Sequence, residues 1–281
     1  MAHVFVAPHP DDVALSCGGL VARLRERGED VAVLTLFSGT GGARRLTPYQ
    51  REALGFGTGS ALRDADAAAE AMARRRLEDE RFAAFAGVST ALLDLPDAVF
   101  RGYEGDDQLL GAPRADDPAP VAALRGELAR LARDGIGIER LYCPMGIGRH
   151  VDHQLARDAG LALLADGPDD SLPFASWAGR VALYEDFPYA HWGGFSGLAD
   201  LPAGALGALP GGVALRPELT DVAGVLERKV EGIAEYASQM DRLFGGAGPM
   251  AEAVRAYAAR VAAAGSVASG AAERVWVAAG G

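Results

Sequence analysis

Short apolar runs alternate with amphipathic, helix-like stretches along the chain, and this alternation constrains the fold more than any other feature of the sequence. Apolar runs of this length are typical of buried strands, and they lie at residues 4–7, 31–37, 90–95, 140–143, 180–184 and 274–277. Between them apolar residues recur with helical spacing, as in residues 13–27, which end at Gly28. Strands that alternate with helices form a mostly parallel sheet with helices on both faces. The sequence therefore predicts an α/β, Rossmann-like fold.

Length and composition limit the domain organisation and the kind of partner. The chain has 281 residues without an internal repeat or a linker-like stretch, so we expect one domain over residues 1–281. A formal net charge of −11 argues against nucleic acid and anionic membrane as partners, because both repel an anionic protein. Cys17 and Cys143 are far apart, and the N-terminus has neither a basic segment nor a long apolar one. We therefore expect a cytoplasmic protein without a membrane span.

The order of strands in such a sheet predicts where a ligand binds. In the doubly wound order 3-2-1-4-5 the first and fourth strands are neighbours, and the chain reverses direction between them. Ligands bind at this switch point, beyond the carboxyl ends of the strands. The segments that follow residues 4–7 and 140–143 are therefore expected to meet in space.

Histidines and aspartates are concentrated in these two segments. The first contains Pro8-His9-Pro10-Asp11-Asp12, the second ends in His150-Val151-Asp152-His153, and together they hold three of the five histidines of the chain. Each motif alone is typical of a helix N-cap or of an exposed helix face. Brought together, two imidazoles and a carboxylate form the three-ligand set of a catalytic metal site with one open position.

The two motifs resemble those of the PIG-L/LmbE-like de-N-acetylases, a family of N-acetylglucosaminyl deacetylases. Weaker points of similarity are residues 75–78, 93–98 and 236–239, so the resemblance spans nearly the whole chain. It implies a metal-dependent hydrolase that removes the acetyl group from an N-acetylglucosaminyl or related N-acyl amino-sugar small molecule. Acetate and a free amine are the products.

The resemblance also implies a role for each residue of the two motifs. His9, Asp12 and His153 are the implied ligands of one divalent ion, with zinc expected and ferrous iron the alternative. Asp11 is the implied general base, which takes a proton from the attacking water. His150 is the implied charged or proton-donating partner, and Asp152 resembles a residue that orients an imidazole.

Two further residues are predicted to contact the substrate. Arg75 is similar in position to a substrate-binding arginine of some family members, although its spacing from Glu78 is equally typical of a solvated ion pair on a helix. Glu185 belongs to the segment of residues 184–189, which follows the fifth strand at the edge where we expect the metal. The alternative for this segment is a strand end with aromatic packing. The long loops at residues 38–63 and 97–120 are expected to supply other contacts.

Other functions remain alternatives. The turn after the first strand lacks the Gly-x-Gly-x-x-Gly pattern of dinucleotide-binding proteins. A metal-dependent phosphoesterase needs more bridging carboxylates and often an asparagine, and this chain contains no asparagine. Another amidase on the same scaffold, such as a thiol-conjugate amidase, fits the motifs as well. A protein that binds a metal without catalysis has no use for the free carboxylate of Asp11.

Overall fold

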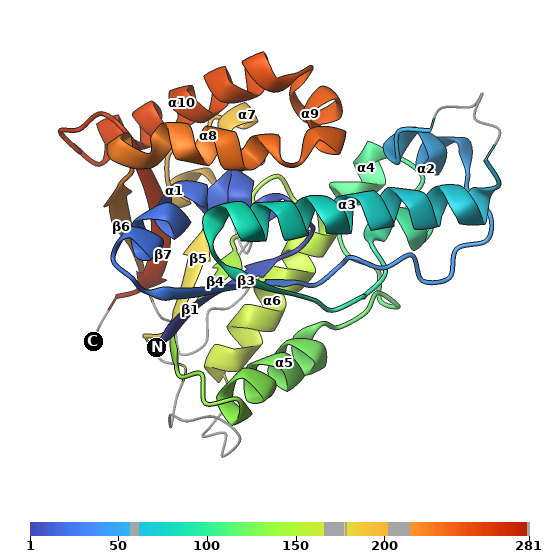
Figure 1. Ribbon diagram of the computed structural model, residues 1–281, viewed down its shortest axis with the longest axis horizontal. Coiled ribbons are helices and arrows are strands. Elements are labelled where there is room, and N and C mark those ends of the chain that lie inside the picture. Colours follow the sequence, from blue (N-terminus) through green and yellow to red (C-terminus); the bar gives the residue numbers. More distant parts are fainter. Residues whose placement is uncertain (57–61, 166–176, 178, 202–213, 280–281) are drawn as a thin grey trace.

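A seven-stranded sheet forms the centre of the molecule (Figure 1). The computed structural model describes residues 1–56, 62–165, 177, 179–201 and 214–279. Along the sheet the strands lie in the order β3-β2-β1-β4-β5-β7-β6. The strands are β1 (Ala2–Ala7), β2 (Asp30–Thr35), β3 (Ser89–Leu92), β4 (Ile138–Pro144), β5 (Val181–Tyr184), β6 (Leu215–Asp221) and β7 (Ala272–Ala278).

The predicted order of the first five strands is confirmed. Strand β1 lies between β2 and β4 and pairs in parallel with both, so the carboxyl ends of β1 and β4 are adjacent. Every residue of β1 is buried, because it has neighbours on both edges and helices on both faces. The alternation of strands and helices therefore predicts both the α/β class and the place of the switch point.

The far edge of the sheet differs from the prediction. Strands β7 and β6 add antiparallel to β5, and β6 was not predicted. Apolar residues recur with helical spacing over residues 220–243, which predicts one long helix from about Thr220, but β6 continues to Asp221. Only alternate residues of β6 are apolar, and Pro217 interrupts the pattern. Proline is tolerated there because β6, in the described part of the chain, is an edge strand that pairs with β7.

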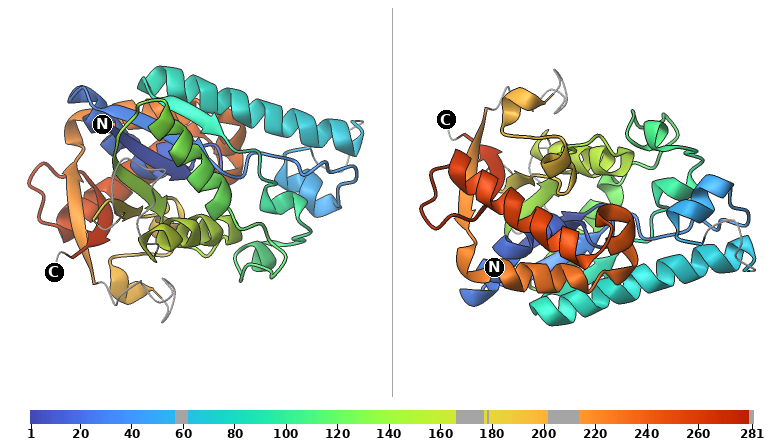
Figure 2. Two further views of the ribbon diagram at one scale, coloured as in Figure 1. Left: turned by 90° about the horizontal axis from the view of Figure 1, so that it is seen from below. Right: turned by 90° about the horizontal axis from the view of Figure 1, so that it is seen from above.

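Helices cover both faces of the sheet (Figures 1 and 2). On one side α1, α3, α8 and α10 pack together, and on the other α5 and α6 lie side by side, with α6 on β4 and β5. The helices are α1 (Asp12–Glu26), α2 (Pro48–Ala53), α3 (Asp64–Ala86), α4 (Asp106–Leu109), α5 (Val121–Arg133), α6 (Val151–Ala165), α7 (Tyr189–Trp192), α8 (Leu226–Ala234), α9 (Ala237–Phe244) and α10 (Ala247–Ala264). No helix in the described residues is both long and apolar enough to cross a membrane.

The two long loops are partly ordered into short helices. Helix α2 lies in the loop of residues 38–63 and begins with a capping box formed by Thr47 and Gln50. Residues 57–61 of that loop lie outside the described residues. Helix α4 lies in the loop of residues 97–120, and both short helices lie beside the N-terminal part of α3 (Figures 1 and 2).

The helix expected over residues 220–243 is divided into α8 and α9. The side chain of Glu78, on α3, accepts hydrogen bonds from the backbone N–H and the hydroxyl of Ser238, in the first turn of α9. Between the two helices, the Tyr236 hydroxyl donates to Asp79, also on α3. Side chains of α3 thus satisfy donors at the start of a new helix, and this turns α9 towards the carboxyl edge of the sheet.

Candidate active site

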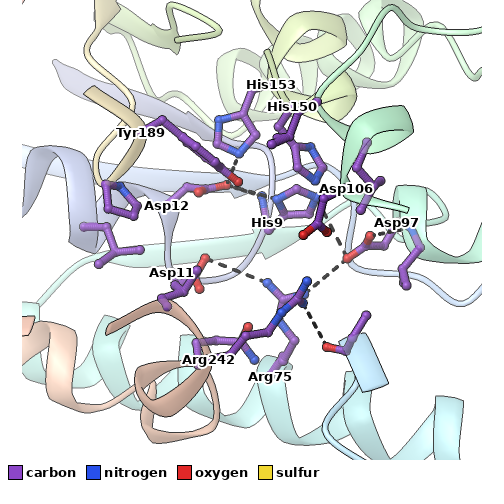
Figure 3. Close-up of a pocket in the computed structure, with 18 of the residues that line it drawn as sticks. His9, Asp11, Asp12, Arg75, Asp97, Asp106, His150, His153, Tyr189 and Arg242 are labelled. Carbon is purple, nitrogen blue, oxygen red and sulfur yellow. Dashed lines mark hydrogen bonds and ion pairs between the residues drawn. The ribbon is translucent and has the colours of Figure 1, made fainter. Parts of the chain in front are cut away.

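The two histidine-containing motifs meet at the carboxyl ends of β1 and β4, as predicted (Figure 3). Helix α1 begins at Asp12, directly after the turn that carries His9. Helix α6 begins just after His150 and carries His153 in its first turn. The Asp12 Oδ2 atom lies 3.4 Å from His153 Nε2, although 141 residues separate them in the sequence. Two rigid helix starts therefore position the side chains of the site.

His9, Asp12 and His153 form a compact set of donors. Asp12 Oδ2 lies 3.3 Å from His9 Nδ1 and 3.4 Å from His153 Nε2, and it accepts a hydrogen bond from the His9 backbone N–H. In a tetrahedral site with bonds of 2.0–2.1 Å, neighbouring ligand atoms lie about 3.3 Å apart. The two separations from Asp12 fit those around a small divalent ion such as zinc.

Each of the two imidazoles is oriented by a buried carboxylate. His9 Nε2 lies 2.8 Å from Asp152 Oδ2, and His153 Nδ1 lies 2.7 Å from Asp186 Oδ1. A neutral imidazole that donates to a carboxylate from one nitrogen presents the lone pair of the other. His9 Nδ1 and His153 Nε2, the atoms that face Asp12, are therefore available as ligands.

The charges around His9 favour a bound cation. Burial alone lowers the pKa of His9, but the carboxylates of Asp97, Asp12 and Asp152 raise it to about 10. Burial alone raises the pKa of Asp12, but His153 and His9 lower it to about 2. Without a cation the site thus retains a proton on His9 to balance its carboxylates. A divalent ion supplies the same positive charge, and the donor set fits it.

A second group of possible ligand atoms, from His9, Asp97 and Asp152, lies on the opposite side of the His9 ring. These carboxylates already face guanidinium groups: Asp97 Oδ2 lies 3.2 Å from Arg75, and Asp152 Oδ1 lies 2.7 Å from Arg101. Asp152 also accepts the hydrogen bond from His9. We therefore assign this group to holding His9, and not to a second ion.

The carboxylate of Asp11 lies beside the donor set and does not cap helix α1. It is the N-cap residue of α1, yet its side chain makes no capping hydrogen bond in the described structure. Its backbone has φ 102°, a conformation rare for a residue other than glycine and costly by about 1–3 kcal/mol. Burial and Asp12 raise the pKa of Asp11, and Arg75 opposes them, so that it is about 7. The capping interpretation of Asp11 is therefore wrong.

Arg75 points into the site from α3 (Figure 3). Its guanidinium contacts Asp97 at 3.2 Å, the Pro10 carbonyl oxygen at 3.2 Å and Asp11 at 3.8 Å. Glu78, the expected partner in a solvated ion pair, instead binds Ser238. The Arg75 side chain is largely buried beside Asp11, the candidate general base. The alternative prediction, a solvated ion pair between Arg75 and Glu78, is therefore wrong.

His150 lies against the other two imidazoles. Its ring centroid is 4.9 Å from that of His9 and 5.2 Å from that of His153. Its Nδ1 accepts a hydrogen bond from the Asp152 backbone N–H, so the proton of the neutral ring is on Nε2. Burial, together with His9 and His153, holds the pKa of His150 well below its ordinary value. The residue is therefore a neutral hydrogen-bond donor in this structure.

The structure does not place Glu185 with these residues. Its carboxylate is buried on the β7 side, where it accepts hydrogen bonds from Tyr257, Arg274 and Trp276. Among the described residues it does not line the cleft, so its position does not support the predicted substrate contact. The next residue, Asp186, holds His153 instead. Successive side chains at the end of a strand point to opposite faces, and the sequence motif does not show which of the two acids faces the site.

A cleft of about 260 Å³ opens over the donor set. The long loops contribute to its walls, as expected, with Leu54 from one and Asp106 from the other. Trp192 on α7 and Arg242 on α9 complete the rim. Of the two, Arg242 was not predicted, because the position of α9 depends on its contacts with distant helices such as α3. The full lining is His9, Asp11, Asp12, Leu15, Ala53, Leu54, Arg75, Asp97, Val99, Asp106, Leu109, Leu110, His150, His153, Pro188, Tyr189, Trp192, Gln239, Arg242 and Leu243.

Comparison with known proteins gives concordant matches. The family model described as GlcNAc-PI de-N-acetylase, PIG-L, matches residues 4–164. The 2'-N-acetylparomamine deacetylase of Streptomyces fradiae is 31% identical over 242 residues, which are 85% of this chain and 73% of the relative. The enzyme of the same name from Niallia circulans is 30% identical over 203 residues, 67% of each chain. The zinc-inhibited form of teicoplanin deacetylase has the same fold, with a TM-score of 0.69 and 23% identity over 98% of this chain and 97% of that one.

Proposed function

Because this chain belongs to the PIG-L family of GlcNAc-PI de-N-acetylases, we propose that it is a metal-dependent N-deacetylase that hydrolyses the acetamido group of an amino-sugar small molecule. One observation carries the proposal. The Asp12 carboxylate lies between the free nitrogens of His9 and His153, and the separate carboxylate of Asp11 lies beside them in a cleft.

The proposed ligands of one divalent ion are His9, Asp12 and His153. Zinc is the expected ion, and ferrous iron suits the same nitrogen and oxygen donors. When bound, such an ion lowers the pKa of a water molecule and polarises an amide carbonyl. Asp152 and Asp186 hold the two imidazoles in the tautomers that this role requires.

The remaining residues of the site carry the proton transfers. Asp11 removes a proton from the water that attacks the acetyl carbon, because its carboxylate lies beside the proposed ligands and makes no capping hydrogen bond. Arg75 keeps this carboxylate in place and is the proposed contact to the sugar. As the bond between carbon and nitrogen breaks, the nitrogen needs a proton, and Asp11 returns the proton that it took from the water. His150, which is neutral, is the proposed hydrogen-bond donor to the reacting group. The products are acetate and the free amine.

The substrate class follows from the relatives and from the size of the cleft. Two relatives named 2'-N-acetylparomamine deacetylase are 31% and 30% identical to this chain over the matched residues. The cleft, at about 260 Å³, suits a single acetylated sugar ring in its inner part. We therefore propose an N-acetylglucosaminyl or related amino sugar of secondary metabolism as the substrate.

The test is a direct assay of the protein loaded in turn with zinc and with ferrous iron. Each form is incubated with 2'-N-acetylparomamine, N-acetylglucosamine, N,N'-diacetylchitobiose and a phosphomonoester, and acetate, free amine and phosphate are measured. Elemental analysis gives the number of ions per chain. Release of acetate and amine with one ion bound supports the proposal. Release of phosphate without acetate would overturn the proposal. So would the absence of any reaction with all four compounds in both metal forms.

A further inference from the structure

Tyr189 is held in one orientation at the edge of the cleft. It begins the short helix α7 after β5, and its ring packs edge-on against two other rings. The centroid of His153 lies 5.5 Å away at an interplanar angle of 88°, and that of Trp192 lies 5.8 Å away at 87°. Contacts of this kind fix the plane of a ring, and they set the direction of its hydroxyl.

The loop before His150 is shaped around this tyrosine. A Cβ atom added to Gly148 would lie 2.4 Å from Tyr189 Cγ and 2.5 Å from both Cβ and Cδ1 of the same residue. Gly148 also has φ +84°, a conformation that other residues rarely adopt. A glycine is therefore needed here, and the space that it leaves is filled by the Tyr189 ring.

The Tyr189 hydroxyl has no hydrogen-bond partner among the described residues, and this distinguishes it within the protein. The chain contains seven tyrosines, all of them in the described part. The hydroxyls of the other six each make a hydrogen bond with another residue: Tyr49, Tyr103, Tyr142, Tyr184, Tyr236 and Tyr257.

The end of the Tyr189 side chain lies beside Asp12 and close to His153 (Figure 3). A donor held in place beside the reaction centre, with no partner in the protein, is arranged to bind a group that arrives with the substrate.

We propose that Tyr189 is a further catalytic residue, whose hydroxyl donates a hydrogen bond to the acetyl oxygen of the substrate. This inference rests on the proposed deacetylation. Attack of water converts that oxygen from a neutral carbonyl to an oxyanion, so the bond strengthens in the transition state. Arg75, the other donor close to Asp11, is already bound to Asp97 and to the Pro10 carbonyl. Two of the Arg75 nitrogens are engaged in these contacts, whereas the Tyr189 hydroxyl has no partner among the described residues.

The test variant is Tyr189→Phe, which removes the hydroxyl and keeps the ring. Loss of one donor to an oxyanion lowers kcat by about 100- to 1,000-fold, and we expect KM to change little. The matched control is Tyr142→Phe. The Tyr142 hydroxyl forms a hydrogen bond with His3 at the start of β1, away from the cleft. The control should retain the kcat of the unmodified protein.

A second measurement needs no turnover. A methylphosphonamidate of glucosamine mimics the tetrahedral intermediate, and calorimetry gives its dissociation constant for each metal-loaded variant. We expect Tyr189→Phe to bind this analogue more weakly, by a factor close to the loss in kcat/KM. Its affinity for the amine product and its metal content should not change. An N-trifluoroacetyl substrate stabilises its own oxyanion, so the loss in kcat should be smaller with it than with the N-acetyl substrate.

The outcomes separate the two proposals. If the unmodified protein deacetylates the sugar and Tyr189→Phe matches it in kcat and in analogue affinity, the role of Tyr189 is refuted and the proposed function stands. If Tyr189→Phe loses metal together with activity, or loses equal factors with acetyl and trifluoroacetyl substrates, the tyrosine only supports the site and the inference is again refuted. If the unmodified protein releases no acetate from any amino sugar, the proposed function fails and the inference with it.

Discussion

Replacing Asp186 by asparagine tests the arrangement that holds His153. In the structure Asp186 Oδ1 lies 2.7 Å from His153 Nδ1, and Oδ2 accepts a hydrogen bond of 2.8 Å from the Ile147 backbone N–H. Both carboxylate oxygens therefore act as acceptors, in a position with no solvent exposure. Asparagine has one acceptor and one donor group, so it cannot replace both interactions.

Either orientation of the asparagine amide harms the site. If its oxygen faces His153, its NH2 group faces the Ile147 N–H, and two buried donors are left opposed. If the amide is turned over, its NH2 group donates to His153 Nδ1, and the proton of the neutral ring moves to Nε2. That nitrogen lies 3.4 Å from Asp12 Oδ2 and is the proposed ligand atom, which a proton would block.

The size of the effect follows from these two cases. A buried unpaired donor costs about 1–3 kcal/mol, and loss of a carboxylate that orients a ligating histidine typically lowers metal affinity about 10- to 100-fold. At about 1.4 kcal/mol per factor of ten, this is about 1.4–2.8 kcal/mol. We therefore expect Asp186→Asn to bind zinc 10- to 100-fold more weakly than the unmodified protein.

The assay is a competition for zinc between the protein and a chelator of known affinity. The control is Asp79→Asn, another buried aspartate, whose partners are the hydroxyls of Thr35, Thr90 and Tyr236. Hydroxyl groups rotate and both donate and accept, so the control should bind zinc within about threefold of the unmodified protein. Equal zinc affinity in Asp186→Asn and the unmodified protein would refute the assignment of His153 Nε2 as a ligand atom.

Three other substitutions test separate parts of the structure. Asp11→Asn should keep its metal and lower kcat by about 100-fold or more; full activity in an acetate-release assay would remove Asp11 as the base. Glu185→Gln should lower the free energy of unfolding by about 1.5–3 kcal/mol and leave KM unchanged; a raised KM with normal stability would restore the predicted substrate contact. Lys229→Met leaves the buried carboxylate of Glu273 without its ion-pair partner, and should cost about 3–5 kcal/mol in urea unfolding. A loss below about 1 kcal/mol would show that the backbone N–H groups of Gly19 and Leu20 satisfy that carboxylate.

Errors in the prediction came from segments whose structure depends on distant partners. The helical pattern of residues 220–243 does not show a break, because the groups that cause it, Glu78 and Asp79, belong to α3. Helix α9 consequently brings Arg242 to the cleft, where the sequence does not indicate it. Strand β6 has too few apolar residues to be recognised, and it is stabilised by its pairing with β7.

The site shows the same division between local and distant information. His9, Asp11 and Asp12 lie within one short segment of the sequence. A turn followed by the start of a helix is therefore enough to bring them together. Which carboxylate pairs with which imidazole cannot be found in this way. Asp152 is 143 residues from His9, and Asp186 is 33 residues from His153.

The sequence by itself determined the order of the first five strands, the switch point between β1 and β4, and the motifs placed there. Apolar periodicity and helix-start residues are local properties, and the topology of a parallel sheet allows few other arrangements. Only the tertiary structure decided which acid orients which histidine, that Glu185 faces the interior beside β7, and that Tyr189 occupies the space over Gly148. A buried polar group pairs with whichever partner the packing of distant segments brings within hydrogen-bond distance. Such packing cannot be read from the local sequence.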